Sequence, residues 1–93
     1  MHHRGEYKVP GGKLVVAEFA IIEGRLRNVR ITGDFFLFPE DAIHLFSNAF
    51  EGALAELPND KLVALVNSTL NADVEMLGFG PEDVVEAIRR GLP

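Results

Sequence analysis

Two kinds of hydrophobic periodicity divide the chain near Pro39. Residues 11 to 33, "GGKLVVAEFAIIEGRLRNVRITG", are rich in Val, Ile and Phe and largely alternate, which is typical of β-strands. Glu23-Gly24 interrupts this run, so we expect a β-hairpin. Beyond Pro39 the apolar residues recur every three or four positions, which predicts helices.

The alternation also predicts the strand register. One face of the first strand carries apolar residues at every second position from Val15 to Ile21, and Val29 and Ile31 mark the apolar face of the second strand. These faces coincide if Val15 pairs with Ile31. Ala17 then lies opposite Val29. Such a register needs a connection of odd length, and we expect three residues, with a glycine supplying a positive φ.

The other face of the hairpin is mixed, since it carries Leu14 and Val16 but also Arg30. Two interpretations stay open. Either a short edge strand at residues 6 to 9 partly covers the sheet, or this face binds a partner. Residues 1 to 5 are expected to be flexible.

Three helices are expected after the hairpin. The first begins at Pro39 and buries a stripe of apolar residues from Ile43 to Leu57. The second spans about residues 60 to 70, and the third begins at Pro81 and ends at Arg89-Arg90-Gly91.

This order of elements predicts an α+β fold: a small antiparallel sheet of two or three strands, starting with the N-terminal hairpin, packed on about three helices. The link "NADVEMLGFG" at residues 71 to 80 is ambiguous. A chain of 93 residues suits one domain, residues 1 to 93.

Composition narrows the function. The chain is 47% hydrophobic, has a net charge of −5 and contains no cysteine. An acidic protein lacks the basic surface that binds nucleic acid or anionic membranes, so we expect neither partner. Thiolate nucleophiles and iron–sulfur sites need cysteine. No segment looks like a signal peptide or a membrane span, so we expect a cytoplasmic protein. His2 and His3 are not expected to bind a metal.

Three short patterns resemble nucleotide-binding or metal-binding motifs, but each lacks residues that the motif requires. "VPGGKL" lacks the glycine and the Ser or Thr of a phosphate loop, since Tyr7 and Leu14 occupy those positions. "GFGPED" places Asp83 at the third glycine of a dinucleotide fingerprint, where a carboxylate repels phosphate. His44 lies one turn after Glu40, which supplies too few metal ligands. We therefore predict no catalytic and no metal-binding residue, and a docking module or accessory subunit.

One longer stretch carries a family resemblance. In "EYKVPGGKLVVAEFAIIEGRLRNVRITGDFFLFPEDAI" the marks are Gly11-Gly12-Lys13, the Gly24 turn, Gly33-Asp34-Phe35-Phe36 and Pro39-Glu40. With these the chain resembles the C-terminal accessory domain of lipoate–protein ligases, in the archaeal arrangement where that domain is a separate small protein. The resemblance covers roughly residues 6 to 57, and the later helices match only in pattern.

The resemblance implies a division of labour. A catalytic large subunit would hold ATP, Mg and lipoic acid, form lipoyl-AMP and pass the lipoyl group to a lysine of an acceptor lipoyl domain. The small chain would have no cofactor of its own and would be needed mainly for the adenylation step. It would meet the lipoyl-acceptor domain only indirectly.

The rings beside Asp34 are assigned separate roles. Phe35 has the parity of the core, whereas Phe36 is expected to project toward the mixed sheet face as an interface anchor. Asp34 is expected to bond nearby backbone or a basic group of the partner. We expect partner binding or completion of the substrate site from Lys8, Gly11, Gly12, Lys13, Leu14, Val16, Arg30, Gly33, Asp34, Phe36 and Phe38.

Two other classes remain as alternatives. A sulfur-transfer or iron–sulfur scaffold protein has a similar α+β layout, although the absence of cysteine argues against it. A regulatory domain that binds a small ligand is the third possibility, and calorimetry on the isolated chain would test it.

Overall fold

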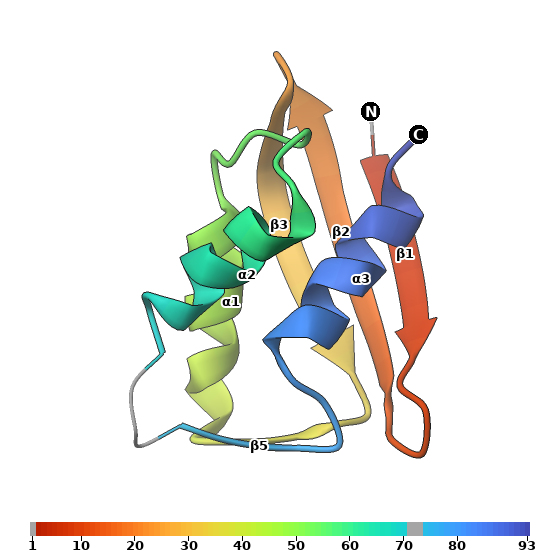
Figure 1. Ribbon diagram of the computed structural model, residues 1–93, viewed down its shortest axis with the longest axis vertical. Helices are drawn as coiled ribbons and strands as arrows, with labels where there is room; N and C mark the ends of the chain where they lie inside the picture. The colour runs from red at the N-terminus through yellow and green to blue at the C-terminus, as the bar shows by residue number, and fades with distance from the viewer. Residues whose placement is uncertain (1, 71–73) are drawn as a thin grey trace.

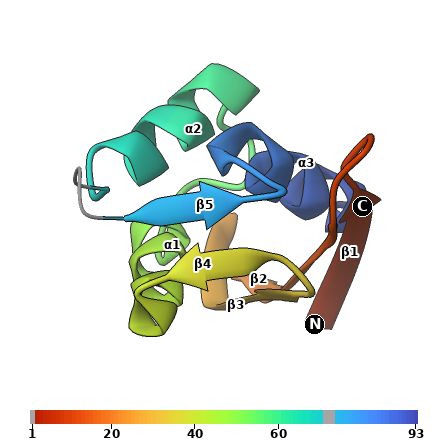
Figure 2. The ribbon, with the colours of Figure 1, turned by 90° about the horizontal axis from the view of Figure 1, so that it is seen from below.

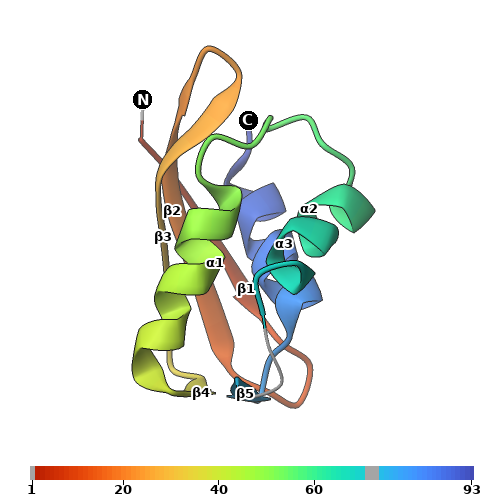
Figure 3. The same ribbon diagram turned by 90° about the vertical axis from the view of Figure 1, so that its left-hand side faces the viewer.

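The computed structural model describes residues 2–70 and 74–93 as three helices and two antiparallel sheets. The helices cover one face of a three-stranded sheet with the order β1-β2-β3 (Figures 1 and 3). The predicted α+β class is confirmed. The elements are β1 (His2–Lys8), β2 (Leu14–Ile22), β3 (Arg25–Gly33), β4 (Phe36–Phe38), the 3₁₀ turn η1 (Glu40–Ala42), α1 (Ile43–Phe50), α2 (Asn59–Asn67), β5 (Glu75–Leu77) and α3 (Pro81–Gly91).

The faces of the hairpin are as predicted, but its register is not. Val15, Ala17 and Phe19 are buried in the core on the same side as Val29 and Ile31. However, Ile31 lies opposite Ala17 rather than Val15, and Val15 pairs with Gly33. The predicted pairing of Val15 with Ile31 is therefore wrong by two residues. A shift of two keeps every side chain on its face, because the side-chain period of a strand is two.

The predicted three-residue connection is also wrong. Ile22 pairs with Arg25, so the loop is the two residues Glu23 and Gly24, with φ of 53° and 77°. Two central residues with positive φ form the tight turn that matches the twist of a hairpin. If the register set by this turn continued along the whole hairpin, the side chain of Val29 would point away from the core.

A β-bulge restores the parity. The register shifts between Glu18 and Ala20, where β3 carries one extra residue, and Asn28 has a φ of 54°. The backbone N–H groups of Asn28 and Val29 donate to the carboxylate of Glu51, at 3.1 and 3.2 Å. The bulge amides therefore have a side-chain acceptor from the end of α1.

The sheet has a third strand at its edge, which was one of the two interpretations of the N-terminal segment. This strand begins earlier than the predicted residues 6 to 9. β1 spans His2–Lys8, so residues 2–5, which were expected to be flexible, form part of a strand. Gly5 explains how closely α3 packs on this strand. A Cβ on Gly5 would lie 1.9 Å from the carbonyl oxygen of Ala87, so only glycine lets α3 pack so closely on β1.

The first helix is shorter than predicted at both ends. Pro39 has an extended ψ of 155°, and η1 precedes α1, so the helix does not begin at Pro39 itself. α1 ends at Phe50 because Glu51 is extended and Gly52 has a φ of 82°, which stops the helix well before Leu57. Leu57 still packs against the core from the loop that follows.

The other two helices agree closely with the prediction. α2 buries Leu62 and Val66, and α3 runs over the predicted residues Pro81–Gly91. Asp83 accepts a hydrogen bond from the backbone N–H of Gly80 at 2.8 Å, which caps the start of α3. No helix in the described part of the chain is long and apolar enough to cross a membrane.

The link after α2 contains β5, which pairs antiparallel with β4 in a separate two-stranded sheet. Figure 2 shows these two strands side by side across the lower end of the molecule. The ambiguous segment at residues 71 to 80 is therefore partly a strand, while residues 71–73 lie outside the described part. The inward side chains of the β4–β5 sheet pack against the core, and its outward side chains form part of the candidate site described below.

Candidate functional site

Two hydrogen bonds between Asp34 and the backbone of Leu14 hold the corner between β3 and β4 in place. The backbone N–H of Leu14 donates to Oδ1 of Asp34 at 2.7 Å, and the N–H of Asp34 donates to the carbonyl of Leu14 at 3.3 Å. A Cβ on Gly33 would lie 2.3 Å from the carbonyl oxygen of Leu14, so this approach needs glycine. Asp34 thus bonds nearby backbone, which was one of its two expected roles.

After this corner the side chains of Phe35 to Phe38 alternate between core and surface. Phe35 is partly buried and its ring stacks on Phe79, with 4.0 Å between ring centroids. Leu37 is 7% exposed. Phe36 and Phe38 face the other way and are 54% and 56% exposed. The assignment of Phe35 to the core is confirmed.

The exposed rings have an apolar neighbour on β5. Leu77 lies opposite Phe36 and is 61% exposed. Three of the five exposed large hydrophobic side chains among the described residues therefore gather on the outer face of the β4–β5 sheet. We call Phe36, Phe38 and Leu77 the end patch. An exposed apolar cluster in a small protein is typical of an interaction site.

Sequence reasoning missed Leu77. The segment "VEMLG" does alternate, since Val74 and Met76 pack against the core while Glu75 and Leu77 are exposed. A run of four residues is too short to distinguish a strand from a loop by pattern alone. Pairing with β4 decides the conformation of this segment, and pairing is a tertiary contact.

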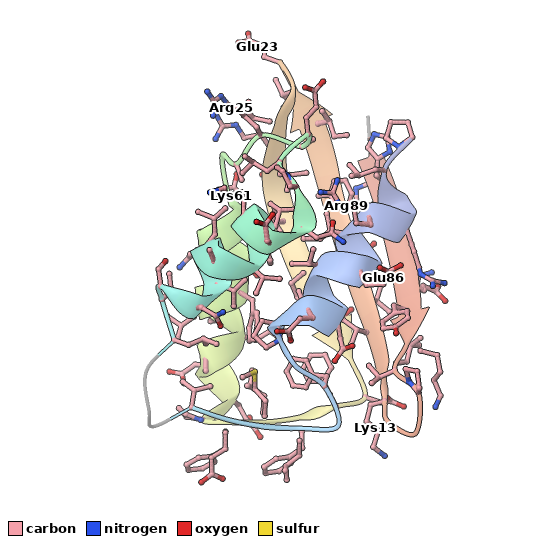
Figure 4. All side chains as sticks on the ribbon, viewed as in Figure 1. Lys13, Glu23, Arg25, Lys61, Glu86 and Arg89 are labelled. Atoms are coloured by element: carbon pink, nitrogen blue, oxygen red, sulfur yellow. The ribbon has the colours of Figure 1, made fainter. Side chains whose placement is uncertain are left out.

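The loop between β1 and β2 lies at the same end of the molecule. The Nζ of Lys8 donates to the carbonyl of Gly12 at 2.8 Å, and the N–H of Lys13 donates to the carbonyl of Gly78 at 3.2 Å. Gly11 has a φ of 71°. Figure 4 shows Lys13 at the lower end, the end where β5 lies. Lys13 thus adds a cation near the end patch.

Two of the predicted site residues lie elsewhere. Val16 and Arg30 are on the outer face of the three-stranded sheet, with Val16 opposite Thr32 and Arg30 opposite Glu18. Phe36 does not project toward that face as predicted. The odd-numbered side chains stay on the core side through the corner, but β3 ends at Gly33 and β4 belongs to a different sheet, so the outward side chains of β4 lie on a different surface from those of β3.

Phe38 is not part of the core, because 56% of its surface is exposed. Its neighbour Leu37 packs in the core instead. Phe38 therefore adds to the apolar surface.

This end of the molecule has a hollow beside the end patch. The hollow has a volume of about 350 Å³, and its lining includes Phe36, Glu40 and Ile43. Within residues 2–70 and 74–93, no three His, Asp or Glu side chains gather closely enough to hold a metal ion. The described part of the chain also has no buried polar or charged side chain. Apolar contact surface is what this end offers.

The fold and the end patch define a small α+β domain with an exposed apolar surface at one end. No family model matches the chain. A sequence comparison and a structural comparison each find similarity to a protein of an archaeal lipoylation system.

A curated relative, lipoate-protein ligase A subunit 2 of Thermoplasma acidophilum, is 35% identical over 65 residues. The aligned part is 70% of this chain and 65% of the relative, so the chain spans somewhat less than two thirds of its length. A solved chain from the bipartite lipoate protein ligase and E2 lipoyl domain of the same archaeon superposes with a TM-score of 0.78 at 27% identity. The superposition covers 96% of both chains. The expected resemblance to an archaeal-type separate small subunit of lipoate–protein ligase is confirmed.

Proposed function

We propose that this chain is the accessory subunit of a two-subunit lipoate–protein ligase. The observation that carries the proposal is the superposition on a chain of a bipartite ligase system over 96% of both lengths, with a TM-score of 0.78. Sequence similarity to a ligase subunit 2 of the same archaeon, at 35% identity over 65 residues, supports the same assignment.

In this proposal the chain binds a catalytic subunit and contributes no reacting group. It has no cysteine, and its acidic composition does not favour binding the phosphates of ATP. ATP, Mg and lipoic acid therefore bind to the partner. The accessory chain enables the partner to form lipoyl-AMP, and it meets the lipoyl-acceptor domain only through that partner.

The end patch is the proposed docking surface. Buried aromatic side chains contribute most to the affinity of protein interfaces, and the patch offers the rings of Phe36 and Phe38 beside Leu77. Lys13 and the Gly11-Gly12 loop sit at the rim of the same end. A partner that covers this end removes three large apolar side chains from water.

The test separates activation from transfer. The chain, a catalytic subunit that lacks its own accessory domain, and the mixture are each assayed for lipoate-dependent exchange of pyrophosphate into ATP. We expect exchange only in the mixture. Transfer of the lipoyl group from supplied lipoyl-AMP to a lipoyl domain should need the catalytic subunit alone.

Exchange by the isolated chain would contradict the proposal. So would full adenylation by the catalytic subunit without this chain. A change of rate without a requirement would instead favour a regulatory domain.

A further inference from the structure

β3 forms one edge of the three-stranded sheet, and only its first half is covered. The N–H of Leu26 donates to the carbonyl of Ala53, and the N–H of Gly52 donates to the carbonyl of Leu26, each at 2.8 Å. The carboxylate of Glu51 accepts from the two bulge amides that follow. The loop after α1 therefore completes the edge as far as Val29.

The second half of β3 presents backbone groups outward. The N–H of Asp34 donates to β2, and bonded residues alternate along an antiparallel pair, so Ile31 and Gly33 face away from β2. Among residues 2–70 and 74–93, no hydrogen bond to the outward groups of Ile31 or Gly33 is found. Unpaired edge groups are a ready template for an added strand.

Two hollows follow this open half. One, of about 530 Å³, lies between Arg30 and His44, and the other, of about 350 Å³, lies between Glu40 and Phe36. The two hollows have Ile31, Thr32 and Ile43 in common in their linings, so they are neighbours along the edge of β3. We call the two hollows together the edge groove, and its residues are Arg30, Ile31, Thr32, Phe36, Glu40 and Ile43.

The opposite edge of the sheet does not offer the same template. β1 carries Arg4, Glu6 and Lys8 at alternate positions, and charged side chains along an edge discourage pairing. Arg4 and Glu6 already form an ion pair with each other. The open half of β3 is therefore the better site for strand addition.

We propose that the edge groove binds an extended segment of the catalytic subunit. The main chain of the segment pairs with Ile31 and Gly33, and one of its apolar side chains enters the hollow beside Phe36. This inference rests on the proposed function, because it takes the catalytic subunit as the partner. Phe36 belongs to both surfaces, so the groove continues the end patch.

Charge specifies the segment further. The groove has the cation Arg30 at one end and the carboxylate of Glu40 at the other. A complementary segment carries an acidic residue near Arg30 and a basic residue near Glu40. A segment with the reverse order would place like charges together at both ends.

Hydrogen exchange of the chain, free and with the catalytic subunit, tests the pairing directly. We expect the amides of Ile31 and Gly33 to exchange at least about tenfold more slowly in the complex. The amide of Asp34 is the control, because it is already bonded to Leu14 and should change less. Binding is confirmed separately by titration.

The two possible failures are distinguishable. If a complex forms but exchange at Ile31 and Gly33 is unchanged, the edge groove is not the site and the proposed function stands. If titration detects no complex, the proposed function fails and this inference fails with it.

A filled groove gives an independent check. Ser47 lines the larger hollow from α1, so Ser47→Trp should block the segment and weaken binding by about tenfold or more. Ala64→Trp, at an exposed position of α2, is the matched control and should bind normally. Normal binding by Ser47→Trp would overturn the inference.

Discussion

Phe36 and Leu77 lie directly opposite each other across the β4–β5 pair, with 54% and 61% of their surfaces exposed. Cross-strand neighbours on one face contact each other, so the two side chains act as one apolar surface. Neither residue supports the core from this side. Both side chains are accessible to another molecule, which makes them suited to mutational tests of binding.

Replacing Phe36 with alanine should weaken binding to the catalytic subunit without unfolding the chain. Loss of an aromatic anchor commonly costs about 2 to 4 kcal/mol, or roughly 30-fold to 1,000-fold in affinity. Exposed positions change stability by only about 0.5 kcal/mol, so the melting temperature should shift by less than about 4 °C. A binding titration and a thermal melt measure the two effects. Adenylation should fall with binding, while transfer from supplied lipoyl-AMP is spared.

Ile22 supplies the matched control for this experiment. It is 51% exposed, but it lies at the hairpin end of β2, away from the end patch. Ile22→Ala should bind the partner normally. If Phe36→Ala binds as tightly as Ile22→Ala, or if it unfolds, the end patch is not the docking surface.

Replacing Phe35 with alanine should have the opposite effect. Its ring stacks on Phe79 at 4.0 Å and packs against the core. Truncating a core Phe typically costs 3 to 5 kcal/mol, and we expect about 3 kcal/mol because Phe35 is only partly buried. Urea unfolding should show the loss as a lower midpoint. A variant with unchanged stability would show that this ring does not support the fold.

Two glycines should respond differently to alanine. A Cβ at Gly5 meets the backbone of α3 at 1.9 Å, so Gly5→Ala must push α3 away from β1 and should cost more than about 3 kcal/mol. Gly11 has open space around it but a φ of 71°, so Gly11→Ala should cost only about 1 to 2 kcal/mol. Denaturant unfolding compares the two. Equal losses would mean that the close contact of α3 and β1 can relax.

The bulge in β3 should depend on Glu51. In Glu51→Ala the amides of Asn28 and Val29 lose their carboxylate acceptor, which should cost about 1 to 3 kcal/mol. Asn28→Gly should be neutral or slightly stabilising, because glycine adopts a φ near 54° without strain. Amide exchange at Val29 reports the first effect directly. Unchanged exchange in Glu51→Ala would show that water replaces the carboxylate without loss.

Much of the fold can be read from the sequence because its local signals agree. The faces of the hairpin, the limits of α3 and the buried side of α2 follow from periodicity and from residues such as Pro81. The core position of Phe35 also follows from local alternation. These features depend on residues that are close together in the chain.

The register shows where local reasoning stops. The alternation of apolar residues is compatible with several strand registers that differ by two residues, because each of them keeps the same side chains on the core face. The alternation also gave no reason to expect a bulge. Leu26 was the available signal, because it is buried on the same face as Val29 despite the odd spacing. The bulge is held by Glu51, which is 22 residues away from Val29.

Some features of the candidate site can likewise be predicted from the sequence, whereas others depend on long-range contacts. Residues 33 to 38 could be recognised from the sequence as an unusual corner, since a glycine, a carboxylate and several aromatic rings follow one another there. The surface to which the exposed rings belong depends on the folded chain, because β4 leaves the main sheet at this corner and pairs with β5. That pairing brings Leu77 beside Phe36, which lies 41 positions earlier in the chain, and leaves Val16 and Arg30 on another face. Long-range pairing carries no signature in a short segment, so the end patch could be found only in the folded chain.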